Sequence, residues 1–222
     1  MRILIISDLH GSKTQMQWIE RQPADLLIIA GDISTFGEGQ DGIKTWLLRL
    51  PFAAAIATGN HEWMGDQNPR WLYELRHERL IVDQAGIIRR IPIVCLPWPR
   101  RGEENHWYEN AMESCRWAES LDEPWILVTH APPQFSKFSG SAEIMTMSIE
   151  DVTRPTIAVC GHTHVPAMWR NNNGVLWINA GACEGDVPHH AWINWNEKTS
   201  AITLADALGE RVLAKRKKSL TI

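Results

Sequence analysis

The sequence predicts an α/β fold, and three observations support this prediction. Five apolar runs have the length of β-strands and are nearly continuous, as expected for strands that are buried on both faces of a sheet. Several of them alternate with helical segments across short loops, which is typical of βαβ units and a parallel sheet. Late in the chain, shorter apolar segments follow one another through turns, which predicts a second, largely antiparallel sheet packed on the first. The five runs are Ile3–Ile6, Leu26–Ala30, Ala53–Ala57, Trp125–Val128 and Ile157–Cys160.

From the N-terminus, the pattern predicts three strands separated by two helices. The strands are expected at residues 2–7, 25–30 and 53–58, and the helices at residues 12–21 and 43–50. Ser12 has the side chain of an N-cap residue, and Pro51 closes the second helix because proline disfavours helical backbone in the residue before it. A glycine-rich loop from Gly31 to Gly42 lies between the second strand and the second helix.

The rest of the chain is expected to contain two more helices and several short strands. The helices are predicted at residues 68–77 and 103–121, with short apolar runs at residues 80–82, 87–88 and 91–96 between them. Beyond Cys160, strands are predicted at residues 165–169, 175–179, 191–195 and 201–204. The pair Asn173-Gly174 is a strong local signal for a hairpin between the first two of these.

Length and composition predict one domain at residues 1–204, followed by a basic C-terminal tail at residues 205–222. A chain of 222 residues with 44% hydrophobic content can bury one sizeable core, and no cap domain is expected. The formal charge of −4 and the isoelectric point near 6.1 create no bulk positive field. Coating of nucleic acid and adsorption to a membrane are therefore not predicted. The basic tail could touch nucleic acid or simply be solvated.

The four cysteines are predicted to be buried, reduced thiols. They are widely spaced and lie mostly inside apolar segments, unlike the denser framework of a disulfide-rich protein. The first strand begins at Met1, which leaves no room for a signal peptide, and no apolar stretch approaches the ~20 residues of a membrane span. We therefore expect a cytoplasmic protein without a membrane partner. The cysteines are Cys95, Cys115, Cys160 and Cys183.

A polar signature follows each of the five apolar runs. Ligands of open α/β sheets bind beyond the carboxyl ends of the strands, so the five signatures are predicted to converge on one crevice. In the D-x-H and H-x-H pairs the side chains are two residues apart, and extended backbone would point both to the same side. The signatures are Asp8-Leu9-His10, Gly31-Asp32, Gly59-Asn60-His61-Glu62, Thr129-His130 and Gly161-His162-Thr163-His164.

The residue types in these signatures predict a metal centre. Aspartate, histidine and asparagine without cysteine form a nitrogen and oxygen ligand set, which suits manganese, iron, zinc or magnesium. A catalytic zinc takes about three protein ligands plus an open position, so seven candidates are too many for one ion. Two ions that share one carboxylate fit better. The candidates are Asp8, His10, Asp32, Asn60, His130, His162 and His164.

The ordered set of signatures resembles the calcineurin-like metallophosphoesterase superfamily. The superfamily pattern D-x-H, G-D, G-N-H-[D/E], H and G-H-x-H occurs here without a gap, and the resemblance extends from Met1 to about Thr203. It implies a four-layer α-β-β-α sandwich of two mixed sheets flanked by helices, with the metals at one end.

The resemblance also implies a ligand set for each ion and a reaction. One ion would be held by Asp8, His10, Asp32 and His164, and the other by Asp32, Asn60, His130 and His162. Asp32 would bridge them, and a hydroxide shared by the ions would attack the phosphorus. Two divalent cations against two carboxylates leave a charge of roughly +2, which attracts a phosphate. Manganese is the first choice for activity in vitro.

His61 adjoins a ligand but stands outside both ligand sets, and we expect it to be the catalytic acid that protonates the leaving alkoxide. The alternative is that it only orients the phosphate. Asn60 and His61 are also expected to bind substrate, and Glu62 to orient rather than react. Arg100 lies near the end of another strand and could clamp a phosphate or nucleotide, or simply be solvent-exposed. Four further residues could line the pocket or simply pack, namely Trp63, Trp98, Asn179 and Gly181.

Within the superfamily, the chain is most similar to the short metallophosphodiesterases. The likeness lies in residues 46–52, 96–98 and 130–133, whereas the Asp-Arg-Gly segment of serine/threonine phosphatases is replaced after Asp32 by Ile33-Ser34-Thr35. This implies phosphodiester hydrolysis of a small phosphorylated substrate, with cyclic nucleotides as candidates. Three alternatives stay open. They are a phosphomonoesterase with the same metals, a nuclease with a basic groove, and a non-catalytic scaffold that would be expected to have lost ligands or the acid.

Overall fold

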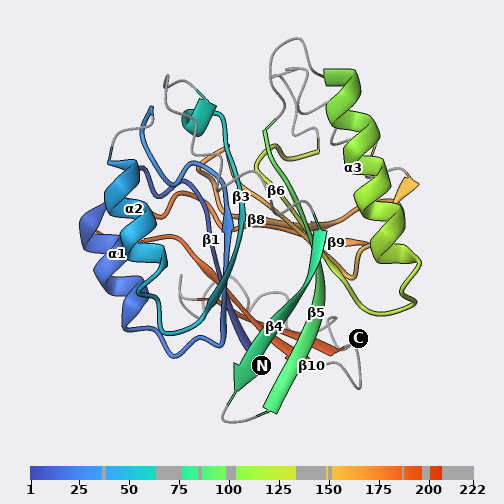
Figure 1. The fold of residues 1–222 in the computed structure, drawn as a ribbon, viewed down its shortest axis with the longest axis horizontal. Coiled ribbons are helices and arrows are strands. Elements are labelled where there is room, and N and C mark those ends of the chain that lie inside the picture. Colours follow the sequence, from blue (N-terminus) through green and yellow to red (C-terminus); the bar gives the residue numbers. More distant parts are fainter. Residues whose placement is uncertain are drawn as a thin grey trace.

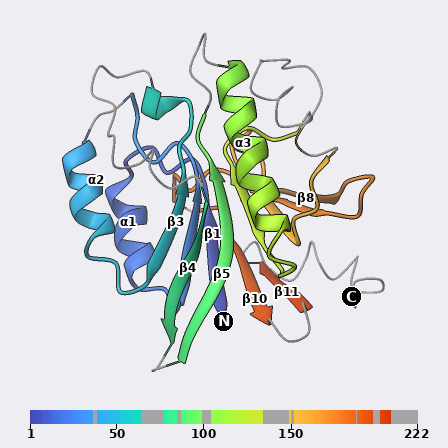
Figure 2. The same cartoon turned by 45° about the vertical axis from the view of Figure 1, so that its right-hand side comes forward.

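Four layers of secondary structure are stacked, with two helix layers enclosing two β-sheets (Figure 1). The structure, a computed structural model, describes residues 1–36, 39–63, 77–84, 87–98, 104–133, 149, 152–186, 188–196 and 201–206. Helices α1 (Lys13–Glu20) and α2 (Gln40–Leu47) lie on one side of the sheets, and α3 (Glu104–Glu119) lies on the other (Figure 2). The predicted sandwich of two mixed sheets flanked by helices is confirmed.

The first sheet has the order β11-β10-β1-β2-β3. Its strands are β1 (Arg2–Ile6), β2 (Leu26–Ala30), β3 (Ala53–Ala57), β10 (Ala191–Asn196) and β11 (Ala201–Asp206). Strands β1, β2 and β3 are parallel, as the βαβ pattern predicts. β10 runs antiparallel to β1, and β11 runs antiparallel to β10, so the sheet is mixed.

The second sheet has the order β4-β5-β6-β7-β9-β8. Its strands are β4 (His77–Gln84), β5 (Ile87–Leu96), β6 (Ile126–Thr129), β7 (Ile157–Cys160), β8 (Ala167–Arg170) and β9 (Leu176–Asn179). The four central strands are parallel, and antiparallel β4 and β8 form the edges. The apolar runs predicted at residues 87–88 and 91–96 therefore belong to one strand.

Three hydrophobic clusters fill the three interfaces between the four layers. Successive residues of a strand point to opposite faces, so Ile3 and Ile5 face the second sheet whereas Leu4 and Ile6 face α1 and α2. The third cluster joins the second sheet to α3, where Cys115 is fully buried. The inner strands β2, β6 and β7 are buried on both faces, which is why they read as continuous apolar runs.

The separate antiparallel sheet predicted for the last four strands is wrong. β8 and β9 do form the predicted hairpin, in which the Gly174 amide donates to the carbonyl oxygen of Asn171 at 3.0 Å. However, β9 also pairs in parallel with β7, and β10 pairs with β1 in the other sheet. A turn signal predicts only which neighbours pair locally, whereas these other pairings join strands that are distant in sequence or connected by a crossover.

Three differences between predicted and observed element ends bear on the predictions above. α2 begins and ends three residues earlier than predicted, after Gly39 in left-handed backbone (φ 71°). His77 begins β4 instead of ending a helix, and residues 68–76 lie outside the described part of the chain. β11 extends to Asp206, beyond the domain boundary predicted at residue 204, and residues 207–222 also lie outside the described part. All four cysteines are buried, and none of them forms a disulfide bond.

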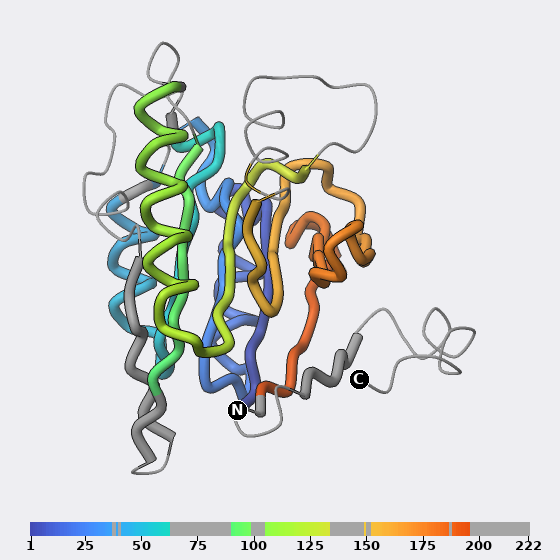
Figure 3. Tube along the Cα trace, turned by 90° about the vertical axis from the view of Figure 1, so that its right-hand side faces the viewer, coloured from blue at the N-terminus to red at the C-terminus, as the bar shows by residue number. Residues whose placement is uncertain are grey.

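The carboxyl ends of the parallel strands lie at the end of the layers opposite the N-terminus (Figures 1 and 3). The short 3-10 helix η1 (His61–Trp63) lies at this same end. Among the described helices, none has the length and apolar character needed to cross a membrane. The loops that leave these strand ends carry the predicted ligand residues.

Candidate metal centre

All seven predicted ligand residues lie in loops at the carboxyl ends of strands. These strands belong to both sheets, so the two sheets contribute to one centre. The structure brings the seven together, as the strand-end argument predicts. The residues are Asp8 and His10 after β1, Asp32 after β2, Asn60 after β3, His130 after β6, and His162 and His164 after β7.

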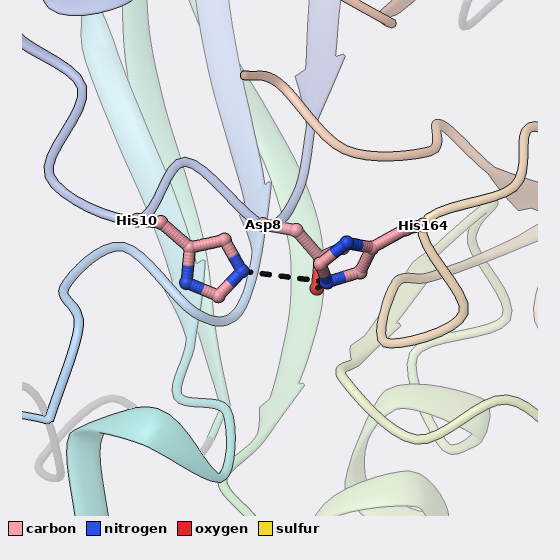
Figure 4. Close-up of side chains that lie close together, drawn as sticks. All are labelled: Asp8, His10 and His164. Carbon is pink, nitrogen blue, oxygen red and sulfur yellow. Dashed lines mark hydrogen bonds and ion pairs between the residues drawn. The ribbon is translucent and has the colours of Figure 1, made fainter. Parts of the chain in front are cut away.

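Asp8, His10 and His164 form the first ligand group. Their side chains point toward one another from loops that are far apart in the sequence (Figure 4). His164 Nε2 lies 3.4 Å from Asp8 Oδ1 and 3.4 Å from His10 Nε2. Asp8 is fully buried, whereas the His164 side chain is 44% exposed. This group therefore lies at the edge of the centre that is open to solvent.

Asp32, Asn60, His130 and His162 form the second ligand group. His130 Nε2 lies 3.2 Å from Asp32 Oδ2 and 3.1 Å from Asn60 Oδ1. His162 Nδ1 lies 3.0 Å from the same Asn60 oxygen. Asp32 also forms one candidate metal-binding set with His10 and His61, and another with Asp8 and His130. Asp32 is thus the carboxylate that lies between the two groups.

The chemistry of these atoms fits divalent cations. His130 Nδ1–H donates to the carbonyl oxygen of Ala30 at 2.7 Å, which leaves the lone pair on Nε2 facing the centre. That lone pair meets the amide oxygen of Asn60 and the carboxylate of Asp32, which are acceptors as well. Acceptors that converge in this way repel one another unless a cation or a proton lies between them.

A proton on His130 relieves this repulsion when no cation is bound. Burial lowers the pKa of His130, but the hydrogen bond and charge of Asp32, with the charge of Asp8, raise that pKa to about 9. Burial raises the pKa of Asp32, but the hydrogen bond and charge of His130, together with the backbone hydrogen bond and charge of His61, lower it more, so the pKa lies below its ordinary value. A bound cation therefore displaces the proton and takes its place beside the carboxylate.

The backbone at the ligands is left-handed, so the expectation of extended backbone in the paired signatures is wrong. Left-handed backbone costs about 1–2 kcal/mol per non-glycine residue and is found where the surrounding structure enforces it. Backbone hydrogen bonds hold the first loop, from Asp8 N to Gly31 O at 3.0 Å and from His10 N to Asp32 O at 2.9 Å. The φ angles are 52° at Asp8, 48° at His10, 51° at Asp32, 71° at His162 and 57° at His164.

Gly31 and Gly59 each precede a ligand residue, and the side chain of another ligand packs against the backbone of each glycine. A Cβ atom on Gly59 would overlap Oδ1 of Asp32, and one on Gly31 would overlap the His130 ring. Gly31 also has a φ of 86°, which disfavours other residues. The glycines of these two signatures are therefore required by how closely the ligands pack.

Glu62 supports the loop that carries Asp32. Its buried carboxylate accepts hydrogen bonds from the backbone amides of Asp32 at 3.0 Å, Gly59 at 2.6 Å and Ser34 at 2.9 Å. Burial and the charge of Asp32 raise the pKa of Glu62. The glutamate joins the loops after β2 and β3, a geometry that agrees with the predicted orienting role.

Asn179, the last residue of β9, supports the histidine loop from the strand next to β7 in the same sheet. Its Nδ2 donates to Gly161 O at 2.8 Å and to Thr163 Oγ1 at 3.0 Å, and its Oδ1 accepts from Gly181 N at 2.9 Å. The side chain is 4% exposed. Asn179 and Gly181 are both buried, so they hold the loop in place instead of lining the pocket rim.

His61 lies beside the centre and remains partly accessible. Its backbone amide donates to Asp32 Oδ1 at 2.9 Å, and its Nε2 lies 3.9 Å from Asp32 Oδ2. The side chain is 24% exposed, so a substrate can reach it. The ring belongs to neither of the two ligand groups described above, but it forms a further candidate metal-binding set with His10 and Asp32.

The sequence matches the family model described as calcineurin-like phosphoesterase over residues 1–166 of 222. The chain belongs to the calcineurin-like phosphoesterase family. This family depends on two metal ions, and membership supports a phosphoesterase hydrolase that acts on a small phosphorylated substrate. A search of curated proteins found no match.

Solved structures of low sequence identity share the fold of this family member. A dimetal phosphatase from Danio rerio is 11% identical, with a TM-score of 0.59 over 87% of this chain and 92% of that one. The phosphopantetheinyl hydrolase of Mycobacterium tuberculosis is 18% identical, with a TM-score of 0.51 over 81% and 89%. GAP50, the anchor in the inner membrane complex of Plasmodium, is 11% identical, with a TM-score of 0.58 over 93% and 88%. At such identities the likeness shows the fold alone.

Glu184 is a residue near the centre that sequence reasoning missed. Its Oε1 lies 3.4 Å from Nδ1 of His164, the ring nitrogen opposite the one that faces Asp8. Carboxylates in this position orient metal-binding histidines and fix their tautomer. Glu184 follows β9 and belongs to none of the family signatures, so no local pattern marks it.

Aromatic rings lie beside His61 and beside the second ligand group. Phe36 stacks on His61 with ring centroids 4.6 Å apart, and Trp98 lies 5.1 Å from the His162 ring and 5.5 Å from the His130 ring. Trp98 therefore contacts the centre, in line with its predicted position at the pocket. Phe36 was missed, and its only signal in the sequence is an aromatic residue in a glycine-rich loop. The predicted substrate residue Arg100 and the side chain of Trp63 lie outside the described part of the chain.

Proposed function

We propose that this protein hydrolyses phosphodiester bonds, with cyclic nucleotides as candidate substrates, and that it uses two divalent metal ions. The observation that carries this proposal is the convergence of all seven ligand-type residues on one centre, with His61 beside it. Two divalent cations against the carboxylates of Asp8 and Asp32 leave a charge of roughly +2, which favours an anionic ester. The native pair of metals stays open, and manganese is proposed for assays.

The two ligand groups correspond to two proposed ions. Asp8, His10, Asp32 and His164 would hold one ion, and Asp32, Asn60, His130 and His162 the other. When bound, such a pair activates a water molecule and stabilises charge on the phosphoryl oxygens. Asp32 would contribute to both ion sites, and Glu62 would keep its loop in place.

His61 is the proposed general acid. Its exposed edge can reach a substrate, while its backbone amide is fixed by Asp32. Protonation of the leaving alkoxide by this ring would complete the reaction. Asn60 and Arg100 are proposed to bind the phosphate with His61. The alternative remains that His61 orients the phosphate without donating a proton.

The aromatic rings favour a diester over a monoester. A diester carries an organic group on each side of the phosphorus, and two aromatic rings lie near the centre, Phe36 against His61 and Trp98 beside the second ligand group. A nucleobase could stack on such a ring. A phosphomonoesterase would need only one organic pocket.

The scaffold alternative comes from a specific comparison. GAP50 shares this fold and is described as an anchor, so the fold does not by itself imply catalysis. This chain keeps all seven ligand-type residues and His61, which favours an enzyme. A nuclease would require a basic groove, and the overall charge of −4 does not favour one.

An activity panel tests the proposed function. Protein stripped of metal and reloaded with Mn²⁺ would be assayed with bis(p-nitrophenyl) phosphate, p-nitrophenyl phosphate, cyclic nucleotides and DNA or RNA oligonucleotides. We expect higher kcat/KM for the small diesters than for the monoester. Preference for the monoester would indicate a phosphomonoesterase, and preference for oligonucleotides a nuclease. No turnover with both ions bound would support the scaffold.

Metal loading should yield two ions per chain. Elemental analysis after Mn²⁺ loading and anomalous scattering from crystals would measure the number and position of the ions. The reason is that one ion has room for only part of the seven-residue ligand set. A single fully occupied position, with Asn60 and His130 uncoordinated, would contradict the dinuclear assignment.

Glu184→Gln should weaken binding of the ion at His10 and His164. Loss of the carboxylate behind a metal-binding histidine typically costs about 10–100-fold in affinity, and the exposure of Glu184 suggests the lower end. Titration of metal-free protein against a chelator with a known Mn²⁺ affinity would measure the change. Asp186→Asn removes a neighbouring exposed carboxylate and should leave the affinity unchanged. Equal effects of the two substitutions would mean that Glu184 acts only through general charge.

A further inference from the structure

The imidazole of His61 is held by rings, not by a hydrogen-bonded carboxylate. Phe36 stacks on it with an interplanar angle of 26°, and the edge of His10 meets it at a centroid distance of 4.7 Å and an angle of 69°. Nε2 faces Asp32. Nδ1 is buried and has no hydrogen-bond partner among the described residues.

An imidazole that lacks a partner on Nδ1 is free to turn about its bond to Cβ. Such a rotation would move Nε2 away from the centre, because a half turn about the Cβ–Cγ bond exchanges the positions of Nε2 and Cε1. The usual restraint is a hydrogen bond to the second nitrogen, which also fixes the tautomer. In the described surroundings of His61, the flat contact with Phe36 and the edge contact with His10 oppose rotation.

Phe36 occupies a position that is costly for a phenylalanine. Its side chain is 50% exposed, and its backbone has a φ of 51°. Left-handed backbone at a bulky residue is uncommon and is found mainly where function requires it. The preceding residues are anchored, since Thr35 Oγ1 donates to His10 O at 3.2 Å and Ser34 N donates to Glu62. The loop therefore presents Phe36 against His61 from a fixed base.

We propose that Phe36 is a positioning residue, which holds the His61 ring with Nε2 directed at the leaving oxygen of the substrate. This proposal rests on the proposed function, in which His61 is the general acid. The proposal gives a role in the reaction to a residue outside the family signatures. It also accounts for the exposure of the Phe36 side chain and for the strain in the Phe36 backbone.

Kinetics of Phe36→Ala test the proposal through leaving groups. For cyclic nucleotides, which lose an alkoxide, kcat should fall by roughly 10–100-fold, the size of effect expected from a misplaced catalytic group. For bis(p-nitrophenyl) phosphate, whose leaving group needs little protonation, kcat should fall much less. KM should stay near the wild-type value for both substrates. Phe36→Tyr, which keeps the ring, should restore kcat.

Two controls separate positioning from other roles. Leu48→Ala, which removes an exposed apolar side chain elsewhere, should leave kcat and KM unchanged. In a His61→Ala background, Phe36→Ala should cause no further loss, because the group it positions is absent. An equal loss in both backgrounds, or a rise in KM with unchanged kcat, would mean that Phe36 contacts the substrate and would overturn the proposal.

A structural measurement tests the positioning independently of activity. Crystal structures of metal-loaded wild type, Phe36→Tyr and Phe36→Ala would show the His61 ring directly. We expect one His61 ring orientation in wild type and Phe36→Tyr. In Phe36→Ala we expect a rotated ring or two alternative ring orientations, with both metals in place. An unchanged His61 ring in Phe36→Ala would overturn the proposal. If wild type turns over none of the substrates, the proposed function fails, and the ring orientation still decides the role of Phe36.

Discussion

Asp32→Asn should weaken both metal ions together and abolish phosphodiester turnover. The Asp32 carboxylate takes part in one candidate set with His10 and His61 and in another with Asp8 and His130, so its charge is expected to serve both ions. The asparagine would also place an amide or a neutral oxygen 3.2 Å from His130 Nε2. Changes to residues behind the ligands cost about 10–100-fold, and a shared ligand should cost more than 100-fold.

The matched control for this variant is Asp122→Asn. Asp122 is exposed and has the same φ of 51° as Asp32, a backbone conformation that asparagine adopts readily. Both substitutions therefore make the same change in the same backbone conformation, and only Asp32 lies among the candidate metal ligands. Metal content and kcat/KM would be measured for both variants. Near-normal turnover in Asp32→Asn would refute the bridging role, and loss of one ion only would place Asp32 in a single ligand group.

His61→Ala should leave both ions bound and slow the reaction according to the leaving group. The ring lies outside the two ligand groups, and its backbone amide, not its side chain, holds Asp32. Loss of a general acid typically costs about 10²–10⁴-fold, so turnover of substrates that release an alkoxide should fall by that amount. Substrates that release p-nitrophenolate need the proton less and should lose less.

The two kinds of leaving group are compared in the His61→Ala variant, and its metal content is checked before each assay. His106→Ala, which removes an exposed histidine on α3, serves as the control and should behave like wild type. Equal losses with both kinds of leaving group would favour the alternative, in which His61 orients the phosphate without donating a proton. Loss of an ion would show instead that His61 is a metal ligand.

Local sequence patterns predicted the strands, the fold class and the ligand residues. The inner strands are buried on both faces, so each leaves a continuous apolar run that ends abruptly at a polar signature. The carboxyl ends of parallel strands share one edge, so the signatures could be placed together without knowledge of the pairing. The same reasoning identified Asp32, Asn60 and His130 as neighbours. In the structure, His130 Nε2 lies 3.2 Å from Asp32 Oδ2 and 3.1 Å from Asn60 Oδ1.

Tertiary structure alone decided how the strands pair and what surrounds the centre. β10 joins β1 across nearly the whole chain, and turn signals do not report contacts of that range. The left-handed backbone at Asp8 and His10 arises because the loop must bend back to pack against the loop after β2. Glu184 and Phe36 belong to no signature, because a contact with His164 or His61 requires only that the folded chain bring one side chain there. Residue types and strand ends therefore predict where the chemistry lies, whereas the restraints on each side chain depend on long-range packing that no local pattern records.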